Sequence, residues 1–164
     1  MARKLVFLAL LVLPLSVFAE FRSEVRTDET RVVAADVQPY VDAMNRERLA
    51  RGEKPLRLNR ELCAAANDRV RDMLTQHYFA HDAPDGTQPF VWADREGYAY
   101  TEIGENLAVG YRTPDDVVDG WMHSPKHRDN VLNDAFVDVG VAVATDSPTR
   151  GFRGPLVVAL YGVR

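Results

Sequence analysis

The chain has 164 residues, of which 46% are apolar and 27% are charged, a composition typical of one globular domain. Its 20 basic and 24 acidic residues give a net charge of −4. This balance argues against a dedicated nucleic-acid-binding protein, whose affinity depends on neutralising phosphates. The single cysteine, Cys63, excludes an internal disulfide and a zinc site built of cysteines.

The first 19 residues have the pattern of a secretory signal peptide. A basic start precedes an unbroken apolar run at 5–13, and the stretch VFA ends at Ala19, after which we expect cleavage. The alternative is an uncleaved membrane anchor, but Pro14 interrupts the run, and a spanning helix needs about 20 apolar residues. We therefore expect an exported protein, periplasmic or secreted, with no permanent membrane anchor after cleavage.

Two helices are predicted in the first half of the domain. Asp36 is positioned to cap a helix that ends near Gly52, and residues 54–56 read as an extended connector. Asn59 then caps a longer helix, with Cys63 packed beside its core-facing stripe as a small apolar side chain. The stripe consists of Leu62, Ala65, Ala66, Arg69, Val70, Met73, Leu74 and His77.

The second half combines short helices with β-branched segments, each bounded by turn residues or by a cap followed by proline. The expected elements are an irregular turn at 81–87, a helix at 89–96 closed by Gly97, a strand or loop at 103–111, helices opening at Thr113 and at Ser124, the latter running to Leu132, and an antiparallel hairpin of strands at 136–144 and 156–163.

This order of elements predicts one α+β or three-layer domain over residues 36–164. Helices come early and strands come late, and the sequence has neither an internal repeat nor a linker that would split the domain. Residues 20–35 are charged and lack a clear period, so we expect a flexible N-terminal lead-in there.

The four histidines form two pairs with a spacing of four residues, His77 with His81 and His123 with His127. On one helix this spacing can place two metal ligands on one face, but neither pair matches the H-E-x-x-H motif. Pro125 also separates His123 from the helix that carries His127. We therefore expect His77 to be a partly buried helix residue and His123 to be a solvated residue at a helix end.

His81, Glu105 and His127 are the candidate functional residues. His81 opens a polar turn, and His127 shares a helical face with an apolar residue, so it should point inward and need a partner. Glu105 lies between a glycine and an apolar pair, which makes it the natural partner. Spacing alone leaves two readings open: a functional cleft, or buried hydrogen bonds that only fix the fold.

Eight short motifs then follow one another in a recognisable order. They are MNRER (44–48), PLRLN (55–59), FAH (79–81), DG (85–86), GY (97–98), GENLA (104–108), WMHSPKHRDNVL (121–132) and VGVAV (139–143). Together they resemble the bacterial branch of the CAP superfamily, the cysteine-rich secretory protein, antigen 5 and pathogenesis-related 1 group, also called SCP-like.

The resemblance implies a three-layer α-β-α sandwich with a central antiparallel sheet and a large cleft lined by histidines and acids. It makes His81 the first cleft histidine, Glu105 the first acid and His127 the second histidine. Eukaryotic relatives carry two His and two Glu there and can hold a divalent metal, but Ser124 and Pro125 replace the second Glu. Residues 158–162 also depart from the aromatic-Thr-Gln strand of bacterial members.

Two functions follow as expectations. The first is a non-enzymatic, monomeric binding module whose cleft holds a lipid, a cell-wall fragment or a peptide, in keeping with the lipid and sterol binding of eukaryotic relatives. The second is a metal-dependent hydrolase, in which His81 and His127 hold Zn²⁺ or act as general bases while Glu105 orients a water.

Overall fold

A computed structural model describes residues 36–164; the predicted signal peptide (1–19) and lead-in (20–35) lie outside the described residues. Within residues 36–164 the chain forms five helices and four strands. In chain order they are α1 (Gln38–Leu49), β1 (Arg57–Leu58), α2 (Arg60–Gln76), α3 (Phe90–Arg95), β2 (Glu102–Val109), α4 (Pro114–His123), α5 (Pro125–Leu132), β3 (Asp138–Ala144) and β4 (Leu156–Val163).

The strands form one sheet in the order β1-β3-β4-β2. β3 and β4 make the predicted antiparallel hairpin, and β2 pairs antiparallel with β4 from Glu102 to Val109. The predicted antiparallel sheet is thus confirmed for these three strands. The short strand β1 pairs parallel with β3, so the complete sheet is mixed. Sequence reasoning missed β1 because two residues are too few to show the period of a strand.

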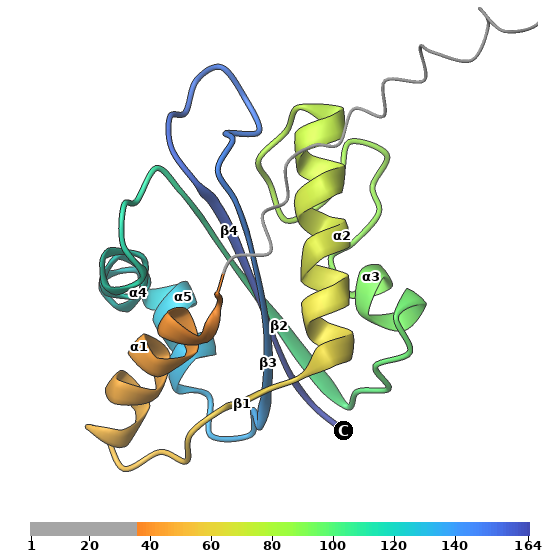
Figure 1. Cartoon of the computed structure of the whole chain (residues 1–164). Coiled ribbons are helices and arrows are strands. Elements are labelled where there is room, and N and C mark those ends of the chain that lie inside the picture. Colours follow the sequence, from red (N-terminus) through yellow and green to blue (C-terminus); the bar gives the residue numbers. More distant parts are fainter. Residues whose placement is uncertain (1–35) are drawn as a thin grey trace, which may run out of the picture.

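The sheet lies between two layers of helices, α1, α4 and α5 on one face and α2 and α3 on the other (Figure 1). The alternation of side chains along β4 produces this division, because successive residues point to opposite faces. Val157 and Tyr161 belong to the core under α1, α4 and α5, whereas Val158 and Leu160 belong to the core under α2 and α3. This arrangement is the predicted three-layer α-β-α sandwich.

Capping side chains fix the start of two helices as predicted. The Asn59 side chain accepts a hydrogen bond from the Leu62 amide at the start of α2, and Thr113 caps α4 in the same way. The prediction for α1 was wrong by one residue at its start: Val37 is the N-cap, although Asp36 accepts a hydrogen bond from the Gln38 amide. α1 also ends at Leu49, earlier than predicted, and a turn continues the chain.

Helix α2 lies directly on the backbone of β3. A Cβ atom added to Gly140 would lie 2.1 Å from the carbonyl carbon of Leu62, far inside a van der Waals contact. Only glycine therefore permits this approach. The close packing fixes the distance of α2, and of every side chain that it carries, from the sheet.

Two backbone carbonyl groups on the outer edge of β2 accept hydrogen bonds from helix side chains. The Trp121 Nε1–H donates to the carbonyl of Leu107 at 3.1 Å, and the Asn130 Nδ2–H donates to the carbonyl of Glu105 at the same distance. Trp121 comes from α4 and Asn130 from α5. These two hydrogen bonds join the helices to the strand that carries Glu105.

Candidate functional site

The three candidate residues line one open cleft of about 740 Å³ beside β2. His81 comes from the loop after α2, Glu105 from β2 and His127 from α5. The structure therefore brings His81, Glu105 and His127 together. The residues that line the cleft are His81, Glu105, Ser124, Pro125, Lys126, His127 and Asn130.

Glu105 is held at both carboxylate oxygens. Its Oε2 lies 3.0 Å from Nε of Arg69, and its Oε1 lies 2.8 Å from Nδ1 of His81. The side chains of Glu105 and Arg69 are buried, whereas that of His81 is half exposed towards solvent. A carboxylate beside a guanidinium is an acceptor only, so Nδ1 of His81 carries the hydrogen that it shares with Glu105.

Arg69 is the residue of this cluster whose part the sequence did not reveal. It lies in the predicted core-facing stripe of α2, where it is fully buried and stacks over Trp92, with Cζ 4.7 Å from the ring centroid. Its guanidinium also donates to the hydroxyl of Tyr78 and to the carbonyls of Ala80 and His81. Arg69 thus positions the loop that carries His81. An arginine within a core-facing stripe was the available signal, because a buried charge needs a partner.

The two cleft histidines have pKa values displaced in opposite directions. The hydrogen bond to Glu105 raises the pKa of His81 above its ordinary value, against the opposing effect of burial. Burial lowers the pKa of His127, and the neighbouring charge on His81 lowers it further. A proton entering the cleft is therefore held first by His81, and His127 takes up a proton only at a lower pH.

Asparagine side chains hold α5 against the sheet. Asn106, fully buried, donates to the carbonyl of His127 at 3.0 Å, and Asn130 donates to the side-chain oxygen of Asn106 at 2.9 Å. Arg48, also buried, donates to the carbonyls of Val131 and Asn133, each at 2.8 Å, near the end of α5. The position of His127 therefore depends on polar groups from α1, β2 and α5 together.

The remaining candidates lie outside the cleft. The prediction for His77 was wrong: it is exposed and ends α2 in a left-handed conformation, φ 58°, which turns it away from the core-facing stripe. His123 is exposed at the end of α4, as expected, with Nδ1 2.8 Å from the Asp119 carbonyl. Cys63 is partly buried, and burial raises the pKa of its thiol, which agrees with a packed rather than a reactive cysteine.

The family model for CAP, the cysteine-rich secretory protein family, matches residues 41–161, which include the whole cleft. The chain belongs to the CAP family. Over 120 residues this CAP chain is 37% identical to the uncharacterized protein YkwD of Bacillus subtilis, covering 71% of this chain and 47% of that protein. It is 26% identical over 122 residues to the uncharacterized membrane protein YlbC of the same organism, covering 74% and 35%. The chain thus spans less than half the length of these two relatives.

Solved structures share the CAP fold. An extracellular protein containing an SCP domain from Bacillus anthracis gives a TM-score of 0.68 at 24% identity, covering 77% of this chain and 40% of that one. An outer surface protein from Borrelia burgdorferi gives 0.67 at 20% identity, covering 79% and 96%. At these identities the likeness concerns the fold alone.

The cleft of this CAP domain does not fit the divalent metal that the resemblance implies. A catalytic zinc site needs three protein ligands and one open position. Within residues 36–164, no group of three or more His, Cys, Asp or Glu side chains is arranged to hold a metal ion. Both oxygens of Glu105 and Nδ1 of His81 already take part in hydrogen bonds, and Ser124 and Pro125 stand where the resemblance to eukaryotic relatives implies a second acid.

Proposed function

We propose that this CAP domain is a non-enzymatic binding module of an exported bacterial protein, with a polar ligand held in the cleft beside β2. The single observation that carries the proposal is the engagement of both Glu105 oxygens by Arg69 and His81. A general base must reach the proton that it abstracts with an available lone pair. A carboxylate held between a guanidinium and an imidazole is better suited to fixing the cleft wall than to accepting a proton.

The lining of the cleft favours a ligand rich in hydrogen-bond acceptors and carboxylates. Lys126 supplies a positive charge, His81 holds its proton more tightly than an ordinary histidine, and Ser124 and Asn130 supply polar groups. Arg69 compensates the charge of Glu105. Among the expected ligand classes, this lining supports a cell-wall fragment or a peptide over a lipid, whose tail would need a mostly apolar wall.

The metal-dependent hydrolase reading uses the same three residues. The side chains present among residues 36–164 do not fit the zinc site on which this mechanism depends. His127, whose pKa is lowered by burial, would be the available base, and the Ser124 hydroxyl that also lines the cleft makes no hydrogen bond with it among residues 36–164. The proposal therefore remains binding without turnover.

Export to the cell surface or the periplasm is part of the proposal. Solved neighbours are described as extracellular or as outer surface proteins. No helix among residues 36–164 is long and apolar enough to cross a membrane. The signal peptide at 1–19 and a monomeric state remain predictions.

Binding of defined probes to the purified domain tests this function. The panel consists of soluble cell-wall muropeptides, palmitate and cholesterol, each titrated by calorimetry and by NMR. We expect muropeptides to bind and to shift the imidazole signals of His81 and His127. Lys126→Ala should weaken that binding about tenfold, the loss of one charge-assisted hydrogen bond. Lys54→Ala removes another exposed lysine, outside the cleft, and should leave the affinity unchanged.

Two outcomes would contradict the proposal. One is binding of palmitate or cholesterol in the cleft with no binding of muropeptides. The other is cleavage of a muropeptide that is lost in His127→Gln while the fold is retained, which would establish a hydrolase.

A further inference from the structure

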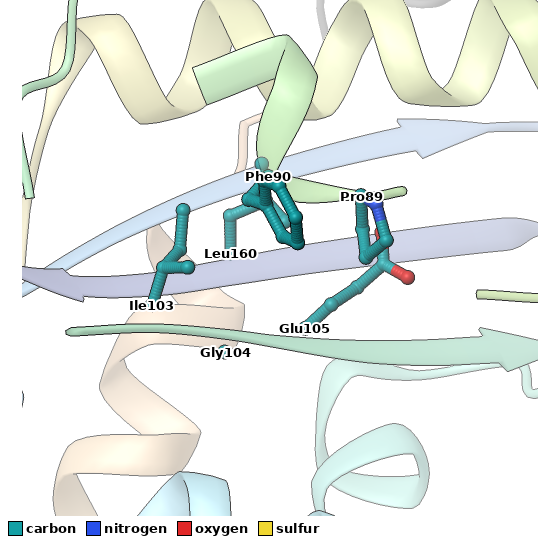
Figure 2. Close-up of a pocket in the computed structure, with 6 residues that line it drawn as sticks. All are labelled: Pro89, Phe90, Ile103, Gly104, Glu105 and Leu160. Carbon is teal, nitrogen blue, oxygen red and sulfur yellow. The ribbon is translucent and has the colours of Figure 1, made fainter. Parts of the chain in front are cut away.

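A small apolar pocket adjoins the polar cleft. Its volume is about 60 Å³, several times the ~10–15 Å³ that one enclosed water requires. Figure 2 shows the side chains of Phe90, Ile103 and Leu160 gathered on one side of β2, with Glu105 extending towards Pro89. The complete lining is Pro89, Phe90, Ile103, Gly104, Glu105 and Leu160.

Glu105 forms the wall between the pocket and the cleft, since it lines both. Arg69 and His81 hold its carboxylate, so this wall is fixed rather than free to swing into either space. The polar cleft and the apolar pocket are therefore separated only by the Glu105 side chain. One ligand can reach both if it carries a charged group and an apolar group a few bonds apart.

The pocket is open to solvent at Phe90, a residue that is 37% exposed. Its other apolar walls are the partly buried Pro89 and Ile103 and the fully buried Leu160. An alkyl group entering here would leave water for an apolar surface, which is favourable by about fourfold in affinity for each methylene group. The volume of about 60 Å³ covers only a few carbon atoms, so an aromatic ring or a fatty-acid chain would leave most of its surface in water.

We propose that the ligand of the cleft is a short peptide with a free carboxylate and, next to it, a small alkyl side chain of alanine to valine size. The carboxylate lies in the cleft near Lys126 and His81, and the alkyl group lies in the pocket between Phe90 and Ile103. This inference rests on the proposed function and adds the chemical class of the ligand. A neutral sugar chain lacks the carboxylate, and a fatty acid carries a tail too long for the pocket.

Four acetylated dipeptides with free carboxylates test the inference: acetyl-Gly-Gly, acetyl-Gly-Ala, acetyl-Gly-Val and acetyl-Gly-Phe. Dissociation constants are measured by NMR titration of the full-length protein. We expect the alanine peptide to bind about fourfold more tightly than the glycine peptide, because one methyl group is buried. The phenylalanine peptide should gain nothing over glycine, and an amide-capped acetyl-Gly-Ala should bind more weakly than the free acid.

Two variants change the size of the pocket in opposite directions. Ile103→Phe fills it, so the affinity ratio between the alanine and glycine peptides should fall to about one. Phe90→Ala enlarges it, so the phenylalanine peptide should now bind more tightly than the glycine peptide. Phe152→Ala is the matched control, because it removes an exposed aromatic ring outside the pocket and should keep the wild-type ratios. Amide spectra of all three variants verify the fold.

The failures of the two proposals can be told apart. Equal binding of the glycine and alanine peptides, or a preference that survives both pocket variants, would overturn the alkyl subsite. The proposed function would still stand if Lys126→Ala weakened muropeptide binding. Absence of binding by all four dipeptides would likewise reject the peptide ligand, and the muropeptide titration would decide the broader function.

Discussion

Arg69 and Glu105 form an ion pair in which Nε lies 3.0 Å from Oε2 and neither side chain is more than 3% exposed. Each charge is compensated only by its neighbours, since bulk water does not reach it. Because Arg69 also donates to the Ala80 and His81 carbonyls, the pair couples α2, β2 and the loop between α2 and α3. The position of His81 is thereby tied to the core of the domain.

Arg69→Met should lower the free energy of unfolding by about 3–5 kcal/mol, because it leaves the Glu105 carboxylate buried without its cation. Urea denaturation measures the change. Arg71→Ala, on the same helix, removes a guanidinium from an exposed pair with Asp68 and should cost no more than about 0.5 kcal/mol. Equal decreases in unfolding free energy in the two variants would show that the buried Arg69–Glu105 pair contributes no more to stability than an exposed ion pair.

The two cleft imidazoles should titrate separately. As the pH rises, His127 should lose its proton first, because burial lowers its pKa, and His81 should lose its proton later, because Glu105 raises its pKa. NMR titration of the ring protons resolves both groups. His81→Gln should raise the pKa of His127, because it removes the neighbouring positive charge. A single shared midpoint, or no response of His127, would contradict this electrostatic arrangement.

The stabilisation that His81 provides should depend on pH. Its pKa in the folded protein lies above the unfolded value of about 6.5, so its contribution is complete below that pH. The contribution should disappear as the pH rises through the folded-state pKa. The difference in unfolding free energy between wild type and His81→Gln should therefore shrink with rising pH. A difference that grows with pH would reverse the assigned sign.

Gly140→Ala should be strongly destabilising, beyond the ~1–3 kcal/mol of ordinary overpacking, because the new Cβ meets the backbone of α2 rather than a flexible side chain. Thermal unfolding or loss of soluble protein reports the effect. Gly151→Ala is the control, since its Cβ would meet only the Thr149 hydroxyl at an ordinary distance of 3.7 Å. A Gly140→Ala protein as stable as this control would disprove the close contact.

Much of the fold follows from local sequence signals. The Asn59 cap, the long stripe of α2 and the β-branched final hairpin each specify an element without help from distant residues. The errors occur where such signals are short or ambiguous. Two residues of β1 cannot show a period, and the left-handed turn at His77 has no glycine to announce it.

The candidate site was only partly visible in the sequence. Its motifs pointed to His81, Glu105 and His127, and the structure brings these three together. Arg69 belongs to the predicted core-facing stripe, but periodicity indicates only which face is buried and does not identify the partner of a buried charge. Asn106 and Asn130 meet only when α5 packs against β2, a long-range contact that sequence spacing does not reveal.

The hydrogen bonds on the outer edge of β2 also affect whether copies of the protein can pair edge to edge. A strand at the border of a sheet can recruit a strand from another molecule through its outward-facing backbone groups. Here Trp121 and Asn130 already occupy the carbonyls of Leu107 and Glu105 that an incoming strand would need. Trp121 and the cleft residue Asn130 therefore also protect this border against edge-to-edge aggregation, without a covalent crosslink.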